Sequence, residues 1–144
     1  MAQSTIRSTE RPYPIPDRDT KPFWEAAREG RLVLPRCLAC RRFHFYPRAI
    51  CPHCMGERLE WVTASGRGSI YSFTVVHRPP PGFEDEAPYM VALVDLEEGV
   101  RMMTRLTGCE PPSVRIGMDV VAAFHAGPDG MHLPFFTPKQ QEAQ

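Results

Sequence analysis

The chain has 144 residues, and its 17 basic and 17 acidic side chains give a formal net charge of 0, which argues against a general nucleic-acid binder. Its hydrophobic content of 42% suffices for a folded protein, while its 16 prolines predict many turns and few long helices. No apolar run is long enough to span a membrane, and residues 1–15 lack the apolar stretch of a secretory signal, so we expect a cytoplasmic protein.

The first 30 residues are expected to form an arm followed by a short helix. Prolines at positions 12, 14 and 16 favour an extended arm over residues 1–19. A helix is predicted over residues 20–30, where Thr20 can cap the N-terminus, Pro22 fits the first turn and Gly30 ends the helix.

One face of this helix carries Phe23, Trp24 and Ala27. So short a helix is marginally stable alone, and its aromatic face must therefore pack on something. Burial within the chain is the preferred interpretation for Trp24, and contact with a partner protein is the alternative.

Four of the five cysteines form two Cys-x-x-Cys pairs separated by ten residues, namely Cys37, Cys40, Cys51 and Cys54. In a reducing compartment such pairs are metal sites more often than disulfides. Two tight knuckles can present four thiolates to one zinc ion, and no open position remains for catalysis, so a structural zinc site is predicted. Iron bound as in rubredoxin is the rival metal, because thiolates alone do not separate the two. A redox dithiol would need only one pair.

Two other side chains near this chemistry are assigned no role in it. His53 lies inside the second knuckle and is expected to be a turn residue, since four cysteines already complete a site. Cys109 has no partner cysteine and no evident acid or base beside it, and is interpreted as an ordinary loop or core thiol.

Residues 31–62 are predicted to form a zinc ribbon with short strands over 32–35, 43–47 and 59–62. So small a unit cannot bury a core without its metal.

Residues 63–144 are predicted to form a β-barrel. Five strands are predicted, over residues 69–77, 89–96, 100–106, 119–126 and 131–137. Residues 69–77 are rich in β-branched and aromatic side chains, and 89–96 is a nearly continuous apolar run. Five strands fit a closed OB-fold barrel and fall short of the roughly seven strands of an immunoglobulin sandwich. The expected fold is therefore mainly β, with an arm and helix in 1–30, a rubredoxin-like zinc ribbon in 31–62 and a five-stranded OB-fold barrel in 63–144.

This order of elements resembles the zinc-ribbon/OB-fold proteins that accompany acyl-CoA enzymes, a family long described only as a domain of unknown function. The resemblance covers about residues 12–137 and is carried by Pro22-Phe23-Trp24, Cys37-Leu38-Ala39-Cys40, Phe45-Tyr46-Pro47-Arg48, Cys51-Pro52-His53-Cys54, Gly68-Ser69-Ile70-Tyr71-Ser72-Phe73-Thr74, Pro88-Tyr89 and Ile116-Gly117-Met118-Asp119-Val120.

The resemblance implies a non-catalytic accessory subunit. Its partner would be a thiolase-like acyl-CoA enzyme, including thiolase-fold aldolases of steroid or lipid side-chain degradation, and in some cases a MaoC-like hydratase. In such a heteromeric complex the subunit would dock on the enzyme and shape or gate a shared acyl-CoA site. No catalytic residue is implied, and only the four cysteines carry over with a role.

Charge points to two candidate contact surfaces. Six arginines and two glutamates lie between residues 31 and 60. Part of this excess compensates the thiolate site, and the rest, at Arg41, Arg42 and Arg48, could bind the phosphates of CoA.

The loop over residues 78–88 is the second surface. It has a run of three prolines, the apolar Phe83 and three acids, Glu84, Asp85 and Glu86. A solvated acidic loop whose Phe83 folds back on the barrel is one interpretation. Docking on a basic enzyme surface is the other.

Two other classes of function fit this sequence less well. An OB-fold module for single-stranded nucleic acid needs stacking aromatics among cations, yet residues 66–137 hold five basic and nine acidic side chains. This charge balance argues against nucleic acid as a partner. A free-standing enzyme ranks lowest, because no Ser-His-Asp spacing, nucleophile elbow or phosphate-binding glycine loop is present.

Overall fold

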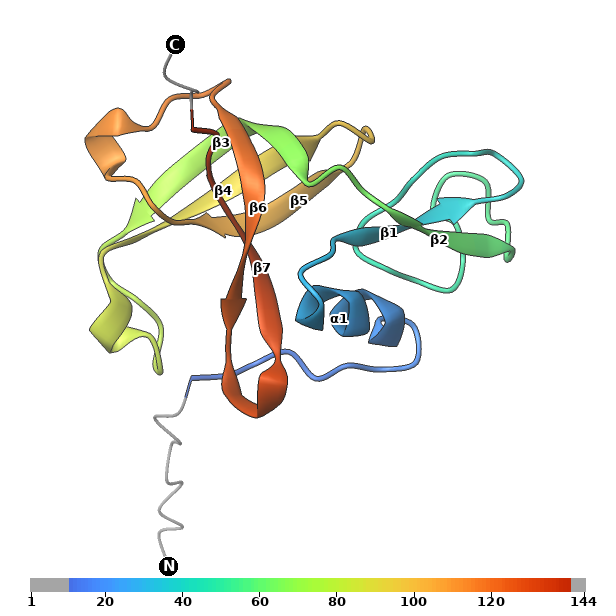
Figure 1. The fold of residues 1–144 in the computed structure, drawn as a ribbon, viewed down its shortest axis with the longest axis horizontal. Helices are drawn as coiled ribbons and strands as arrows, with labels where there is room; N and C mark the ends of the chain where they lie inside the picture. Colours follow the sequence, from blue (N-terminus) through green and yellow to red (C-terminus); the bar gives the residue numbers. More distant parts are fainter. Residues whose placement is uncertain (1–10, 141–144) are drawn as a thin grey trace, which may run out of the picture.

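The structure, a computed structural model, describes residues 11–140. Within them the chain forms a small two-stranded sheet, β1–β2, and a closed barrel with the strand order β3-β4-β5-β7-β6 (Figure 1). The elements are α1 (Lys21–Arg28), β1 (Val33–Cys37), β2 (Leu59–Thr63), β3 (Arg67–Val76), β4 (Tyr89–Leu96), β5 (Arg101–Leu106), β6 (Asp119–Ala126) and β7 (His132–Pro138), with 3-10 turns at Glu84–Glu86, Pro111–Ser113 and Pro128–Gly130.

The helix α1 begins and ends close to the predicted positions, but its start is held differently. Thr20 occupies the N-cap position without a side-chain bond to the helix. Its hydroxyl and its N–H both donate to Asp17 Oδ1 at 2.9 Å, so the preceding turn uses this side chain instead. Gly30 ends the helix as predicted, with φ at +75° and its N–H donating to Ala27 O at 3.0 Å.

The aromatic face of α1 is buried inside this chain. Phe23 and Trp24 are 2% and 7% exposed, and their rings meet edge to face with centroids 4.9 Å apart. The helix contacts both β1 and β7, and therefore joins the ribbon to the barrel. Little of the Trp24 side chain is left for a partner.

The ribbon has two strands where three were predicted. β1 and β2 pair antiparallel from Val33 opposite Thr63 to Cys37 opposite Leu59. The expected strand over 43–47 is wrong, since only Phe43 forms a bridge, opposite Arg36.

A proline explains why this third strand does not form. His44 N–H donates to Pro35 O at 3.2 Å, but Pro35 has no N–H to return the second bond of that pair. The ladder therefore stops after one bridge.

The five-stranded barrel is confirmed. Antiparallel hairpins join β3 to β4, β4 to β5 and β6 to β7. The barrel closes where β3 pairs with β6, and where Leu106 of β5 lies opposite Phe136 of the parallel strand β7. Both closing contacts are short, with three residue pairs between β3 and β6 and one between β5 and β7, as in the partly open OB-fold barrel.

One continuous core runs from the helix into the barrel. Alternate residues of β4 point inward, so that Met90, Ala92, Val94 and Leu96 are buried. The same cluster of buried apolar residues includes Phe23 and Leu34 on the ribbon side. Among the described residues no helix has the length and apolarity needed to cross a membrane.

Candidate metal centre and neighbouring surfaces

Two turns of the same geometry hold the four cysteines. In the first, at the end of β1, Arg41 N–H donates to Cys37 O at 2.9 Å, and in the second, Met55 N–H donates to Cys51 O at 2.9 Å. The residue after each Cys-x-x-Cys pair has φ at 65°. Repetition of this turn directs both thiols of each pair toward one point.

The four sulfur atoms meet between the two turns. The Sγ atoms of Cys37, Cys40, Cys51 and Cys54 all lie within 4.8 Å of one another, and the Cys40–Cys51 pair is 3.7 Å apart. Tetrahedral zinc with Zn–S bonds of about 2.3 Å needs sulfurs about 3.8 Å apart. The residues therefore fit one zinc ion held by four thiolates, which makes the metal structural.

Backbone donors in both turns favour thiolates. The backbone N–H of Cys40 is the main cause that lowers the pKa of Cys37 to about 7. Burial raises the pKa of the Cys51 thiol, but the N–H groups of Cys54 and His53 outweigh it, and the pKa lies below its ordinary value. These two thiols are thereby prepared as metal ligands.

The Cys54 thiol depends most on the metal to become a thiolate. The N–H of Gly56 lowers the pKa of Cys54, but the neighbouring sulfurs, that of Cys37 first, raise it to about 11. A further negative charge beside existing thiolates is unfavourable until a dication neutralises them.

Gly56 belongs to this centre and was not predicted. A Cβ at this position would lie 3.3 Å from both Cys37 Sγ and Cys54 Sγ. Its carbonyl also accepts the N–H of Cys51 at 2.8 Å. A glycine two residues after the second Cys-x-x-Cys pair is the sequence signal that could have found it.

His53 and Cys109 lie outside the sulfur cluster. The His53 ring Nε2 is 3.1 Å from Phe43 O, so the ring tethers the segment between the knuckles. Burial, with the charge of Glu110 as a lesser cause, raises the pKa of the Cys109 thiol, which keeps it protonated.

Two of the three candidate CoA arginines share a groove. Arg41 and Arg42 are exposed and line a groove of about 700 Å³ between the ribbon and the β4–β5 turn, together with Phe43 and Phe45. Arg48 is exposed but does not line this groove.

A buried histidine lies in the wall of the same groove. His44 is 2% exposed, and neither ring nitrogen has a hydrogen-bond partner within residues 11–140. Burial lowers the pKa of His44 because the charged ring would lose its water. The backbone of Arg48 opposes this effect, whereas the charges of Arg48 and His53 add to it, and the pKa lies below its ordinary value.

The acidic loop divides into exposed and engaged residues. Glu84 and Asp85 are exposed on a short 3-10 turn. Glu86 instead forms ion pairs with Arg11 and Arg105, and the half-buried Phe83 ring lies 6.3 Å from that of Tyr89.

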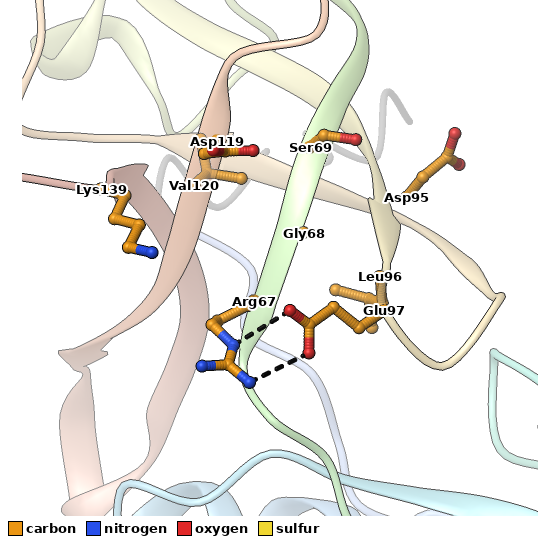
Figure 2. Close-up of a pocket in the computed structure, with 9 residues that line it drawn as sticks. All are labelled: Arg67, Gly68, Ser69, Asp95, Leu96, Glu97, Asp119, Val120 and Lys139. Carbon is orange, nitrogen blue, oxygen red and sulfur yellow. Dashed lines mark hydrogen bonds and ion pairs between the residues drawn. The ribbon is translucent and has the colours of Figure 1, made fainter.

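A hollow of about 320 Å³ lies where β3 passes between β4 and β6 (Figure 2). Arg67 and Glu97 face one another across it, with Nε to Oε1 at 3.0 Å and Nη2 to Oε2 at 3.3 Å. Position 68 must be glycine, since a Cβ there would lie 2.6 Å from the backbone oxygen of Asp95. The hollow is lined by three acidic and two basic side chains, and it contains none of the predicted site residues.

Comparison with known proteins identifies the family. The family described as "ChsH2, rubredoxin-like zinc ribbon domain" matches residues 24–60, and "ChsH2, C-terminal OB-fold domain" matches residues 61–125. A solved structure described as "Ltp2-ChsH2(DUF35) aldolase" is 42% identical with a TM-score of 0.78, over 88% of this chain and 98% of that one.

Two relatives agree. A "DUF35 domain-containing scaffold protein" of Methanocaldococcus jannaschii is 37% identical over 83% of this chain and 89% of its own. A "Probable enoyl-CoA hydratase alpha subunit" of Thermomonospora curvata is 43% identical over 89% of this chain, which spans 40% of that relative's length. The chain therefore belongs to the ChsH2 (DUF35) family, in which a rubredoxin-like zinc ribbon precedes an OB-fold domain.

Proposed function

We propose that this chain is a non-catalytic accessory subunit of an acyl-CoA-processing enzyme of the thiolase or thiolase-fold aldolase class. The observation that carries the proposal is the 42% identity to a chain of an Ltp2-ChsH2(DUF35) aldolase, nearly all of which is covered. The scaffold and alpha-subunit descriptions of the two relatives support the same role.

The metal centre agrees with such a role. Four thiolates fill the coordination of zinc, so the ion binds no substrate and no activated water. The nucleophile and base of the reaction would come from the partner enzyme. Zinc then stabilises the ribbon. Through α1 and the shared core, it also helps to keep the ribbon in position against the barrel.

The groove between ribbon and barrel is the proposed CoA contact. Arg41 and Arg42 supply planar guanidinium groups that suit phosphate oxygens, and Phe43 and Phe45 supply apolar surface for the pantetheine chain. Arg48 would contact CoA only from outside this groove. Acyl-CoA would thus lie between the accessory subunit and the enzyme, and either subunit alone would bind it weakly.

The loop over residues 78–88 is the proposed docking surface. Glu84 and Asp85 are exposed and can steer the chain toward a basic enzyme surface. Phe83 is half-buried, and can contribute apolar contact beside them. Trp24 and Glu86, with their side chains engaged inside the chain, would support this surface rather than form it.

Co-purification tests the proposal. The tagged chain is expressed with each thiolase-like or MaoC-like protein encoded beside its gene, and complexes are identified by size-exclusion chromatography with light scattering. We expect one stable complex with acyl-CoA turnover, and no turnover by the purified chain. Turnover at an enzymatic rate by the chain free of other proteins would overturn the proposal. Tight binding of single-stranded oligonucleotides without any complex would favour the OB-fold nucleic-acid module.

A further inference from the structure

A cluster of three charged side chains, Arg11, Glu86 and Arg105, joins the N-terminal arm to the barrel. Glu86 accepts hydrogen bonds from two arginines, at Oε1 from Arg11 Nη1 and at Oε2 from Arg105 Nη1, the latter at 2.9 Å. The side chain of Arg11 is 23% exposed, that of Glu86 28% and that of Arg105 19%. One carboxylate therefore bridges two guanidinium groups, and a net positive charge remains in a half-buried place.

Aromatic rings cover the faces of both guanidinium groups. The Arg11 guanidinium lies 5.1 Å from the ring centre of Tyr13 and 5.2 Å from that of Phe83, and Arg105 lies 4.3 Å from that of Tyr89. Stacking fixes the groups and leaves their edges to donate hydrogen bonds. Arg11 Nε is buried with no acceptor within residues 11–140. An unused buried donor is costly, and favours an acceptor that residues 11–140 do not supply.

Arg11 and Arg105 line a hollow of about 290 Å³. Its polar wall includes Arg11, Arg105 and His125, and its apolar wall includes Tyr13 and Phe135. This volume is at the lower end of small-molecule sites, and suits a small acid or one side chain rather than a whole nucleotide.

The hollow, lined by the arm, the end of β5 and parts of β6 and β7, lies beside the face on which OB-fold barrels bind ligands. That face is made by the second and third strands, here β4 and β5, and by the loops that join strands one to two and four to five. Glu86 belongs to the first of these loops, between β3 and β4. Tyr13 packs on the second loop, where a Cβ at Gly127 would lie 2.9 Å from its ring. In Figure 1 the arm passes beside the β6–β7 turn. The arm therefore covers part of this face, and the hollow remains.

We propose that this hollow binds a carboxylate group with a short apolar stem. One negative charge balances the excess of the Arg11–Glu86–Arg105 trio. A carboxylate matches the edge of a guanidinium group in two parallel hydrogen bonds. The carbon chain behind it meets the rings of Tyr13 and Phe135. The group belongs to a free small carboxylic acid or to an acidic side chain of a bound protein.

Titration with sodium butyrate, followed by amide chemical shifts of the full-length protein, tests the site. Butyramide is the uncharged control, and sodium chloride keeps the ionic strength constant. We expect saturable shifts at Thr107, His125 and Phe135 with butyrate only. Equal shifts with both compounds, or none up to roughly 50 mM butyrate, would overturn the proposal.

A matched pair of variants locates the binding. Arg105→Gln should weaken butyrate binding roughly tenfold, because it removes a charge-assisted donor. Arg67→Gln should leave it unchanged, since Arg67 pairs with Glu97 outside this hollow. Unchanged binding in Arg105→Gln would place the anion elsewhere. If Arg105→Gln does not fold, the comparison of butyrate with butyramide still decides.

One further measurement separates the two sources of the carboxylate. Butyrate slows formation of the complex with a co-purifying protein if that protein supplies the group. It leaves the rate unchanged if the natural ligand is a free acid.

Discussion

The Sγ atoms of Cys37 and Cys54, which belong to different knuckles, lie 3.5 Å apart. Such a separation fits two ligands of one zinc ion, and without a metal it would bring two thiolates into repulsion. The metal thus connects the end of β1 to the segment that leads into β2. Zinc binding is consequently part of the folding free energy of the ribbon.

We expect the purified protein to contain one zinc ion per chain, and Cys51→Ser to lose it. Loss of one ligand should lower the free energy of unfolding by more than about 3 kcal/mol, because the ribbon has little core of its own. Elemental analysis measures the metal, and denaturant unfolding measures the stability. Cys109→Ser is the matched control and should retain full zinc, as Cys109 lies outside the cluster.

The same preparation separates zinc from iron. A four-thiolate zinc site is colourless because Zn²⁺ has a filled d shell, whereas ferric iron in this site absorbs visible light. Less than half an equivalent of any metal in fresh protein, or full folding of Cys51→Ser, would contradict the assignment.

Gly56→Ala should weaken zinc binding roughly tenfold, since the new Cβ would press on two ligand sulfurs and second-shell changes act on this scale. Competition with a chelating dye measures the affinity. Gly99→Ala is the comparison: Gly99 has φ at +86° with nothing within 4 Å of its Cβ position, so alanine strains the turn without touching the metal. Equal zinc affinity in Gly56→Ala and the native chain would show that this contact relaxes at no cost.

The buried His44 should make the protein less stable in mild acid. Its pKa is lowered in the folded state, so below its unfolded pKa near 6.5 the unfolded chain binds a proton that the folded chain does not. Stability from this residue is fully present above that pH and falls as the pH drops toward the folded pKa. The expected slope is up to about 1.4 kcal/mol per pH unit.

Urea unfolding of native protein and His44→Leu, between pH 8 and 5 in excess zinc, checks this slope. Protonation of the cysteines also destabilises the protein in acid, but it affects both chains alike. The difference in unfolding free energy between the two therefore isolates the histidine. A difference that stays constant across this range would mean that His44 gains a partner for its proton.

Sequence reasoning predicted the barrel well because its strands are runs rich in apolar residues between clear turns. The bounds of β4 and β6 coincide with the predicted 89–96 and 119–126. The knuckles were predictable for another reason, as the cysteine spacing encodes the turn geometry directly.

The failures arose where distant residues decide local structure. Segment 43–47 alternates like a strand, but its partner strand offers Pro35, which cannot complete the ladder. Glu86 resembles its exposed neighbours in sequence, and only the fold brings Arg11 and Arg105 to it across the chain. Burial of Trp24 within the chain, by contrast, was predicted and is confirmed, because the helix packs against β1 and β7.

The acidic loop gives the last prediction, because its residues should separate association from stability. Glu84 and Asp85 are exposed, and the double reversal Glu84→Lys/Asp85→Lys should slow association with the partner enzyme while the unfolding temperature stays nearly fixed. The effect should be larger at about 0.05 M than at 0.5 M NaCl, since salt screens the steering charges.

Glu86→Gln should instead lower stability and leave the association rate nearly unchanged. It leaves two half-buried guanidinium groups without their carboxylate, and lowers the free energy of unfolding by about 1–3 kcal/mol. Biolayer interferometry at both salt concentrations and thermal unfolding of each variant provide the comparison. If the double reversal associates at the native rate at low salt, the enzyme docks elsewhere on this chain, and the groove beside Arg41 and Arg42 becomes the next surface to test.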